Sequence, residues 1–204
     1  MPENEEVGIE TDYQQRLQTA LARIDKERIA DAPEDQISSW AKALASEFHE
    51  NWRNTRKTPT GYEPRPKLTK DYNWVNNARE QLIPEYKHDP ATCKDIVDIA
   101  NLSFGSLPED WQEENLKAAE FAVHYVVEAI RNNTDNDSLL DNGGKAVNYK
   151  WIERHNHEPW VQADPALSEG WSHPDFSSKQ KEKDKEQVVL AAELIAKLFS
   201  QNQS

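Results

Sequence analysis

The chain has 204 residues, 36% of them hydrophobic, and 37 Asp and Glu residues against 24 Lys and Arg residues give a net charge of −13. No apolar run approaches the roughly 18 residues of a membrane helix, the acidic N-terminus lacks the apolar core of a secretory signal, and one cysteine allows neither an internal disulfide nor a Cys-rich zinc site. We therefore expect a cytoplasmic protein without membrane contact, and without general nucleic-acid binding because its acidic surface would repel a phosphate backbone.

Helical periodicity dominates the first quarter of the chain. Residues 1–9 are polar and are predicted to be a disordered tail, after which a helix begins near Thr11 and Gln14, which have the spacing of a capping box. That helix ends before Pro33, and the next one is predicted over residues 34–56. Its apolar stripe recurs every three or four residues, at Ile37, Trp40, Ala41, Leu44, Phe48 and Trp52.

Residues 57–91 break this pattern because they contain five prolines and a glycine-bearing turn. A short helix over residues 72–82 and minor β pairing within residues 57–75 are the only regular structure predicted there. Residues 92–102 are predicted to form another short helix, since Ile96, Ile99 and Ala100 have helical spacing.

Three further helices are predicted in the second half. The first follows Pro108, the second covers residues 144–155, and the last covers residues 178–200. The polar cluster Asp135-Asn136-Asp137-Ser138 resembles the start of a calcium loop but lacks the required Gly and Glu, so we interpret it as a turn between helices. The predicted fold is all-α, with residues 10–133 and 138–201 as two helical halves packed as one unit.

The two halves contain a similar order of motifs, which predicts an internal repeat. In the first half, His49, Trp52 and Arg56 precede a Pro-rich loop and the segment Leu107-Pro108 that leads to Asn115. In the second half, Trp151 precedes a Pro-rich loop, Phe176, Asp184 and Lys185, while Asn148 stands at the position of the early His. The expected architecture is therefore two pseudo-symmetric helix–loop–helix halves with long Pro-rich loops.

This order of motifs resembles the ryanodine-receptor repeat, the RyR domain that also occurs in bacterial and phage proteins. The resemblance covers residues 40–125 and 145–200, although the first loop is longer than the family pattern and the second copy lacks the early His. It implies a helical module used for binding or regulation, with no catalytic residues to carry over.

A basic segment stands out in this acidic chain. Residues 51–70 contain six Lys and Arg residues and one Glu, so the remainder of the chain has a charge of −18. Arginine forks bind phosphate and carboxylate groups, and neighbouring aromatic rings can stack on a base. The alternatives are that these cations pair with acidic helices of the same chain or of a second subunit, or that they form a patch on which a protein docks. The predicted ligand-binding residues are His49, Trp52, Arg53, Arg56, Tyr62, Arg65, Lys67 and Trp74.

A second group of polar residues gives weak candidates for a metal site. His155, His157 and His173 lie among carboxylates, but their spacing matches no established metal motif. We therefore predict no cofactor, no metal ligand and no catalytic residue, while leaving a metal-dependent enzyme as a second alternative.

These observations favour a non-enzymatic module that binds a small anionic, nucleotide-type ligand through residues 51–70. The first alternative is an acidic interaction or regulatory subunit, such as a phage or mobile-element protein, that docks on a basic partner. The sequence leaves a homodimer open and identifies neither the ligand nor the partner.

Overall fold

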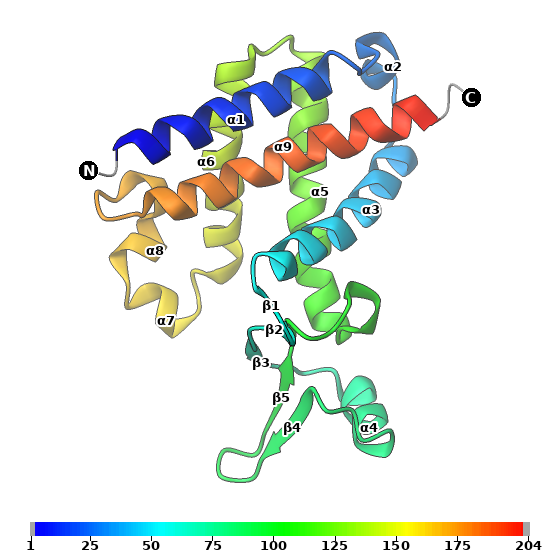
Figure 1. The fold of residues 1–204 in the computed structure, drawn as a ribbon, viewed down its shortest axis with the longest axis vertical. Helices are drawn as coiled ribbons and strands as arrows, with labels where there is room; N and C mark the ends of the chain where they lie inside the picture. Colours follow the sequence, from blue (N-terminus) through cyan, green and yellow to red (C-terminus); the bar gives the residue numbers. More distant parts are fainter. Residues whose placement is uncertain (1–2, 202–204) are drawn as a thin grey trace. The chain divides into compact units, whose positions relative to one another are not determined.

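The computed structural model describes the backbone of residues 3–201 and the side chains of residues 12–200. Over these residues the chain forms nine α-helices, two 3₁₀ turns and five short strands, which confirms a mostly all-α fold (Figure 1). None of the described helices combines the length and apolar character that a membrane span requires. The chain divides into two compact units, Met1–Leu44 with Ala118–Ser204, and Ala45–Lys117.

The helices are α1 (Glu3–Leu21), α2 (Lys26–Ala30), α3 (Glu34–Asn54), α4 (Tyr72–Glu80), α5 (Glu109–Arg131), α6 (Asn136–His155), α7 (Pro159–Gln162), α8 (Pro165–Glu169) and α9 (Ser178–Gln201). The strands are β1 (Lys57–Thr58), β2 (Gly61–Tyr62), β3 (Pro66–Leu68), β4 (Tyr86–Asp89) and β5 (Lys94–Asp98). Helices α3, α4 and α9 confirm the predictions from periodicity. The larger unit combines both ends of the chain, and α3 and α5 each run from one unit into the other.

The larger unit is built around α9, which packs against α6 and α1; Figure 1 shows α1 and α9 running alongside each other. Their apolar stripes supply fully buried side chains, including Leu17, Leu139 and Ile195. Burying such a side chain contributes about 1.5–3 kcal/mol, which an isolated amphipathic helix cannot obtain. Above this core, the Arg16 guanidinium binds both Glu186 and Glu193 at 2.9 Å.

The smaller unit contains an antiparallel sheet with strand order β3-β5-β4. Val97 at the centre of β5 pairs with Lys67 on β3 and with Tyr86 on β4, so these three side chains share one face of the sheet. Val97 is fully buried and joins a core of Ile99, Leu102 and Leu107, against which Trp52, Trp74, Phe104 and Trp111 pack. This small aromatic core holds the sheet, α4 and the end of α3 together.

The structure corrects the prediction of a helix over residues 92–102. Residues 94–98 form the central strand β5, which bonds to β3 on one side and β4 on the other. The spacing of Ile96 and Ile99 is compatible with a helix, but the pairing partners come from segments that periodicity within this stretch does not reveal. Strand formation is therefore a tertiary effect here.

Two helix boundaries also differ from the predictions. Helix α1 begins at Glu3, so the backbone of residues 3–9 is helical instead of a disordered tail, while residues 1–2 lie outside the described residues. Helix α6 begins at Asn136 instead of 144, because Asp135 caps it by accepting the Ser138 backbone N–H at 2.8 Å. Asp135 therefore caps α6, and residues 136–138 form its first turn instead of a turn between helices.

Candidate functional site

The basic segment lies in the smaller unit, where side-chain bonds fix its backbone. Asp110 at the start of α5 accepts the Thr69 hydroxyl at 3.0 Å and the Lys70 backbone N–H at 2.8 Å. Asp71 caps α4 through the Trp74 N–H at 2.9 Å and accepts the Glu109 N–H. The chain from β3 to α4 is therefore held in one conformation beside the N-terminus of α5.

Two of the predicted ligand-binding residues are buried and already engaged. His49 is 2% exposed and its Nε2 lies 2.9 Å from the Leu102 carbonyl oxygen, and burial lowers the pKa of this imidazole. Arg53 is 9% exposed; its Nε donates to the Ala100 carbonyl at 2.9 Å and its Nη1 to Glu50 at 2.8 Å. These residues anchor the loop that follows β5 and leave no exposed group for a ligand.

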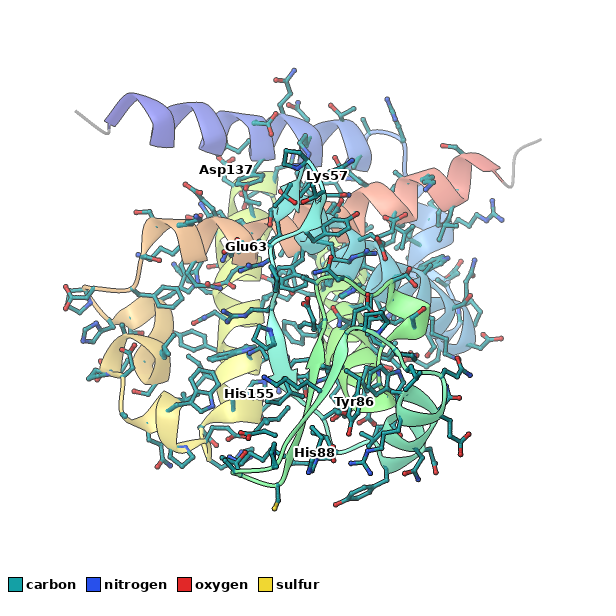
Figure 2. The ribbon with its side chains drawn as sticks, turned by 60° about the horizontal axis from the view of Figure 1, so that its bottom comes forward. Lys57, Glu63, Tyr86, His88, Asp137 and His155 are labelled. Carbon is teal, nitrogen blue, oxygen red and sulfur yellow. The ribbon has the colours of Figure 1, made fainter. Side chains whose placement is uncertain are left out.

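Three others form stacked pairs around the β1–β2 hairpin. The Arg56 guanidinium lies 5.2 Å from the Trp52 ring and binds Glu63 at 3.3 Å, while Arg53 lies 4.3 Å from the Tyr62 ring. Figure 2 labels Glu63 and Lys57 beside this hairpin. Arg56 is therefore partly neutralised by Glu63, an acidic residue within the basic segment itself.

Arg65 and Lys67 have a different environment. Arg65 directly precedes β3 and Lys67 lies in its centre, so the two cations are close in the chain. The Lys67 ammonium is half-buried and lies 5.4 Å from the centre of the Trp111 ring. Burial, followed by the charge of Arg65, lowers the pKa of Lys67. Within the part of the chain that the structure describes, neither side chain forms an ion pair.

The remaining predicted ligand residue, Trp74, has a structural role. Its indole packs on the apolar core, lies edge-on to Tyr86 at 6.2 Å and donates Nε1–H to the Ser106 carbonyl at 2.9 Å. Trp111 takes the place expected of Trp74, because it is the aromatic ring beside the Lys67 ammonium. No local sequence signal indicates this exchange, since it depends on the register of β3 beside α5.

The weak metal candidates do not gather into one group. His155 stacks on Trp151 at 4.8 Å, His157 lies 3.5 Å from Glu158, and the His173 Nδ1 accepts the Asp175 N–H. Among the residues with described side chains, no three His, Cys, Asp or Glu residues are placed to hold a metal ion. The metal-dependent alternative therefore gains no support from this geometry.

A polar depression of about 580 Å³ lies in the larger unit between α1 and α9. Arg16, Arg23 and Lys197 line it, and two glutamates already neutralise the Arg16 guanidinium at 2.9 Å. None of the predicted ligand-binding residues lines this depression.

Sequence reasoning missed a cluster on α4, β4 and β5. Asp95 accepts hydrogen bonds from Arg79, Tyr86 and His88, and Figure 2 shows Tyr86 and His88 on neighbouring parts of β4. Alternation of Tyr86 and His88 would have indicated the cluster only if residues 86–89 had been recognised as a strand. Comparison with protein-family models, curated proteins and solved structures finds no match to this chain.

Proposed function

We propose that the smaller unit is a non-enzymatic binding module for a small phosphorylated ligand of nucleotide type, held by Arg65, Lys67 and Trp111. The single observation that carries this proposal is the half-buried Lys67 ammonium, which lies on an indole beside a second cation without a carboxylate partner. Burying a charge without a counter-ion costs free energy, and a bound phosphate would supply that counter-ion.

The chemistry of the three side chains suits such a ligand. The Arg65 fork and the Lys67 ammonium provide donors for phosphate oxygens, and the Trp111 ring provides a surface for a planar base. Trp111 is held in place because its Nε1 donates to the Leu68 carbonyl at 2.9 Å. His49 and Arg53, which the sequence suggested as contacts, instead bind carbonyl groups of the loop that follows β5.

The proposal predicts that ligand binding stabilises the protein. A nucleotide, cyclic dinucleotide or ADP-ribose derivative present at one hundred times its Kd should raise the free energy of unfolding by about 2.7 kcal/mol. We would measure this by thermal shift and confirm the Kd by calorimetry. Arg65→Ala and Lys67→Met should each abolish the shift without lowering the Tm of the free protein.

Lys42→Met is a matched control, because Lys42 is an exposed cation on α3 outside the basic segment. It should leave the ligand-induced shift intact. A shift that persists in both Arg65→Ala and Lys67→Met would refute the assignment of the site. The absence of a shift with every phosphorylated compound would refute the proposed ligand class.

The second candidate function is an acidic interaction subunit that docks on a basic partner. The observation that favours it is the charge of −18 outside residues 51–70. Docking of this kind predicts a salt-sensitive complex, because exposed charges are screened at high ionic strength. A complex that survives 1 M salt without loss would contradict it.

We also infer that the two halves retain a repeat related to the RyR domain. In the first half the buried His49 binds a loop carbonyl and Arg56 lies over Trp52; in the second the buried Asn148 accepts the Trp171 N–H and His155 stacks on Trp151. Leu107 and Phe176 are both buried. An experimental structure in which residues 40–56 and 107–125 do not superpose on 139–155 and 176–194 would refute the repeat.

A further inference from the structure

Three lysine ammonium groups surround one indole ring in the larger unit. The ring belongs to Trp171, in the 3₁₀ turn η2 (Gly170–Ser172) that packs on α6. The ammonium nitrogens of Lys181, Lys145 and Lys185 lie 5.7, 5.9 and 6.0 Å from its centre. Because all three distances end at one point, the three positive charges form a compact group.

The packing of two helices brings these charges together. Asp141 and Lys145 are one turn apart on α6 and share a helix face. Lys181 and Lys185 stand in the same relation on α9. The two helices pack against each other, and the Lys185 ammonium binds Asp141 across the contact at 2.8 Å. The group of lysines therefore depends on the register of α6 against α9, which no single segment of the sequence indicates.

The Trp171 ring at the centre of this group has a fixed position. Its Nε1 donates to one oxygen of the buried Asp184 at 2.9 Å, and Gln180 donates to the other oxygen at 3.2 Å. A Cβ added at Gly144 would meet the ring at 2.9 Å, so α6 approaches the indole closely there. The Trp171 backbone N–H also donates to the Asn148 side chain at 3.4 Å. These contacts hold the indole as a rigid surface for the ammonium groups.

The lysines differ in burial and in their partners. Lys185 is 8% exposed and pairs with Asp141, whereas Lys181 is half-buried and Lys145 is exposed. Neither Lys145 nor Lys181 forms an ion pair among the residues whose side chains are described. Like charges repel, and an indole attracts each cation only weakly. Two positive charges therefore lie on the ring without a carboxylate partner, in a chain whose net charge is −13.

We propose that Lys145, Lys181 and Lys185 form a second anion-binding site, which binds an oligophosphate group of two or three linked phosphates. An ammonium group carries three donors on a flexible stem, so several of them can approach the oxygens of tetrahedral phosphates from different directions. Charge-assisted hydrogen bonds of this kind are among the strong ones in proteins. The indole holds the ammonium groups together, and their N–H groups contact the phosphate oxygens.

The charge of the site favours linked phosphates over a single one. Diphosphate and triphosphate carry more negative charge than phosphate, so they match three ammonium groups better. We expect the affinity to increase from phosphate to diphosphate to triphosphate and to decrease as salt is added. The site lies in the larger unit and shares no residue with Arg65, Lys67 and Trp111, so either proposal can fail without the other.

Calorimetric titration with sodium triphosphate in EDTA tests the proposal. The full chain carries Arg65→Ala and Lys67→Met, so that the site proposed for the smaller unit does not contribute. We expect saturable binding, which Lys145→Met/Lys181→Met should weaken about 10-fold or more through lost charge-assisted hydrogen bonds. Methionine keeps most of the apolar stem on the ring. Lys145→Gln alone changes an exposed side chain and should also weaken binding, so the test does not depend on how the double variant folds.

Lys179→Met/Lys183→Met is the matched control, because these exposed lysines lie on the same helix α9 and their loss changes the net charge equally. It should bind triphosphate as tightly as its parent. Absence of binding in the parent, or equal weakening in the two double variants, would overturn the proposal. ATP that binds these lysines as tightly as triphosphate would support it with a nucleotide as the source of the group, and weaker binding of ATP would support it with a free oligophosphate.

Discussion

The substitution Arg53→Met tests whether Arg53 stabilises the fold of the smaller unit instead of contacting a ligand. The methionine keeps most of the apolar stem but removes the donor to the Ala100 carbonyl, the bonds to Glu50 and the guanidinium over Tyr62. Ala100 is fully buried, so its carbonyl would lose its partner without gaining water.

The structure allows an estimate of the cost. A buried carbonyl left without its donor costs about 1–3 kcal/mol, and the loss of a cation–π contact adds about 0.5–1 kcal/mol. The bond to Glu50 contributes little more, because that side chain is 41% exposed and exposed ion pairs contribute about 0–1 kcal/mol. We therefore expect Arg53→Met to lower the free energy of unfolding by about 2–4 kcal/mol.

Urea unfolding followed by tryptophan fluorescence would measure this change, since Trp52, Trp74 and Trp111 lie in the same unit. Hydrogen exchange over residues 95–107 should show faster opening of the anchored loop. Arg65→Met is the matched control: its side chain is exposed and forms no ion pair among the described residues, so stability should change by about 0.5 kcal/mol or less. Equal effects of the two substitutions would refute the division between anchor and ligand contact.

Three further predictions concern stability. Leu82 has φ +53° and is 83% exposed, so Leu82→Gly should raise the free energy of unfolding by about 1 kcal/mol, whereas Gln81→Gly at φ −87° should lower it in the same urea assay. A Cβ on Gly144 would lie 2.9 Å from an indole carbon, so Gly144→Ala should lower the free energy of unfolding by about 1–3 kcal/mol. The control Gly105→Ala meets nothing within 4 Å and should lower it by less than about 0.5 kcal/mol. Equal losses of stability in the two variants would contradict the packing around Gly144. Burial raises the pKa of Asp184 from 3.8 to about 6, so the folded protein favours the neutral carboxyl group. This preference stabilises the fold by up to about 3 kcal/mol at low pH, and the stabilisation is lost as the pH rises from 3.8 to about 6. Asp184→Asn should remove that slope from stability measured across this pH range, and an unchanged slope would show that another group causes it.

Local sequence determined the elements whose stabilising interactions are close in the chain. The stripe from Ile37 to Trp52 and the helix over 178–201 could be predicted, because side chains three and four residues apart occupy one helix face whatever surrounds them. The short helix α4 could be predicted as well, and the structure adds its local cap, Asp71, which accepts the Trp74 N–H.

Only the tertiary structure decided which residues of the basic segment remain exposed. His49 and Arg53 find their partners 53 and 47 residues away, at Leu102 and Ala100, so no spacing rule within α3 indicates that they are buried anchors. Strand β5 forms because β3 and β4 supply its hydrogen bonds from both sides, which overrides the helical spacing of its isoleucine. The same register places Lys67 on Trp111 and collects the Asp95 cluster from three elements. The proposed ligand-binding site and the Asp95 cluster therefore depend on contacts between segments that are distant in the chain. Patterns within a single segment do not predict such contacts.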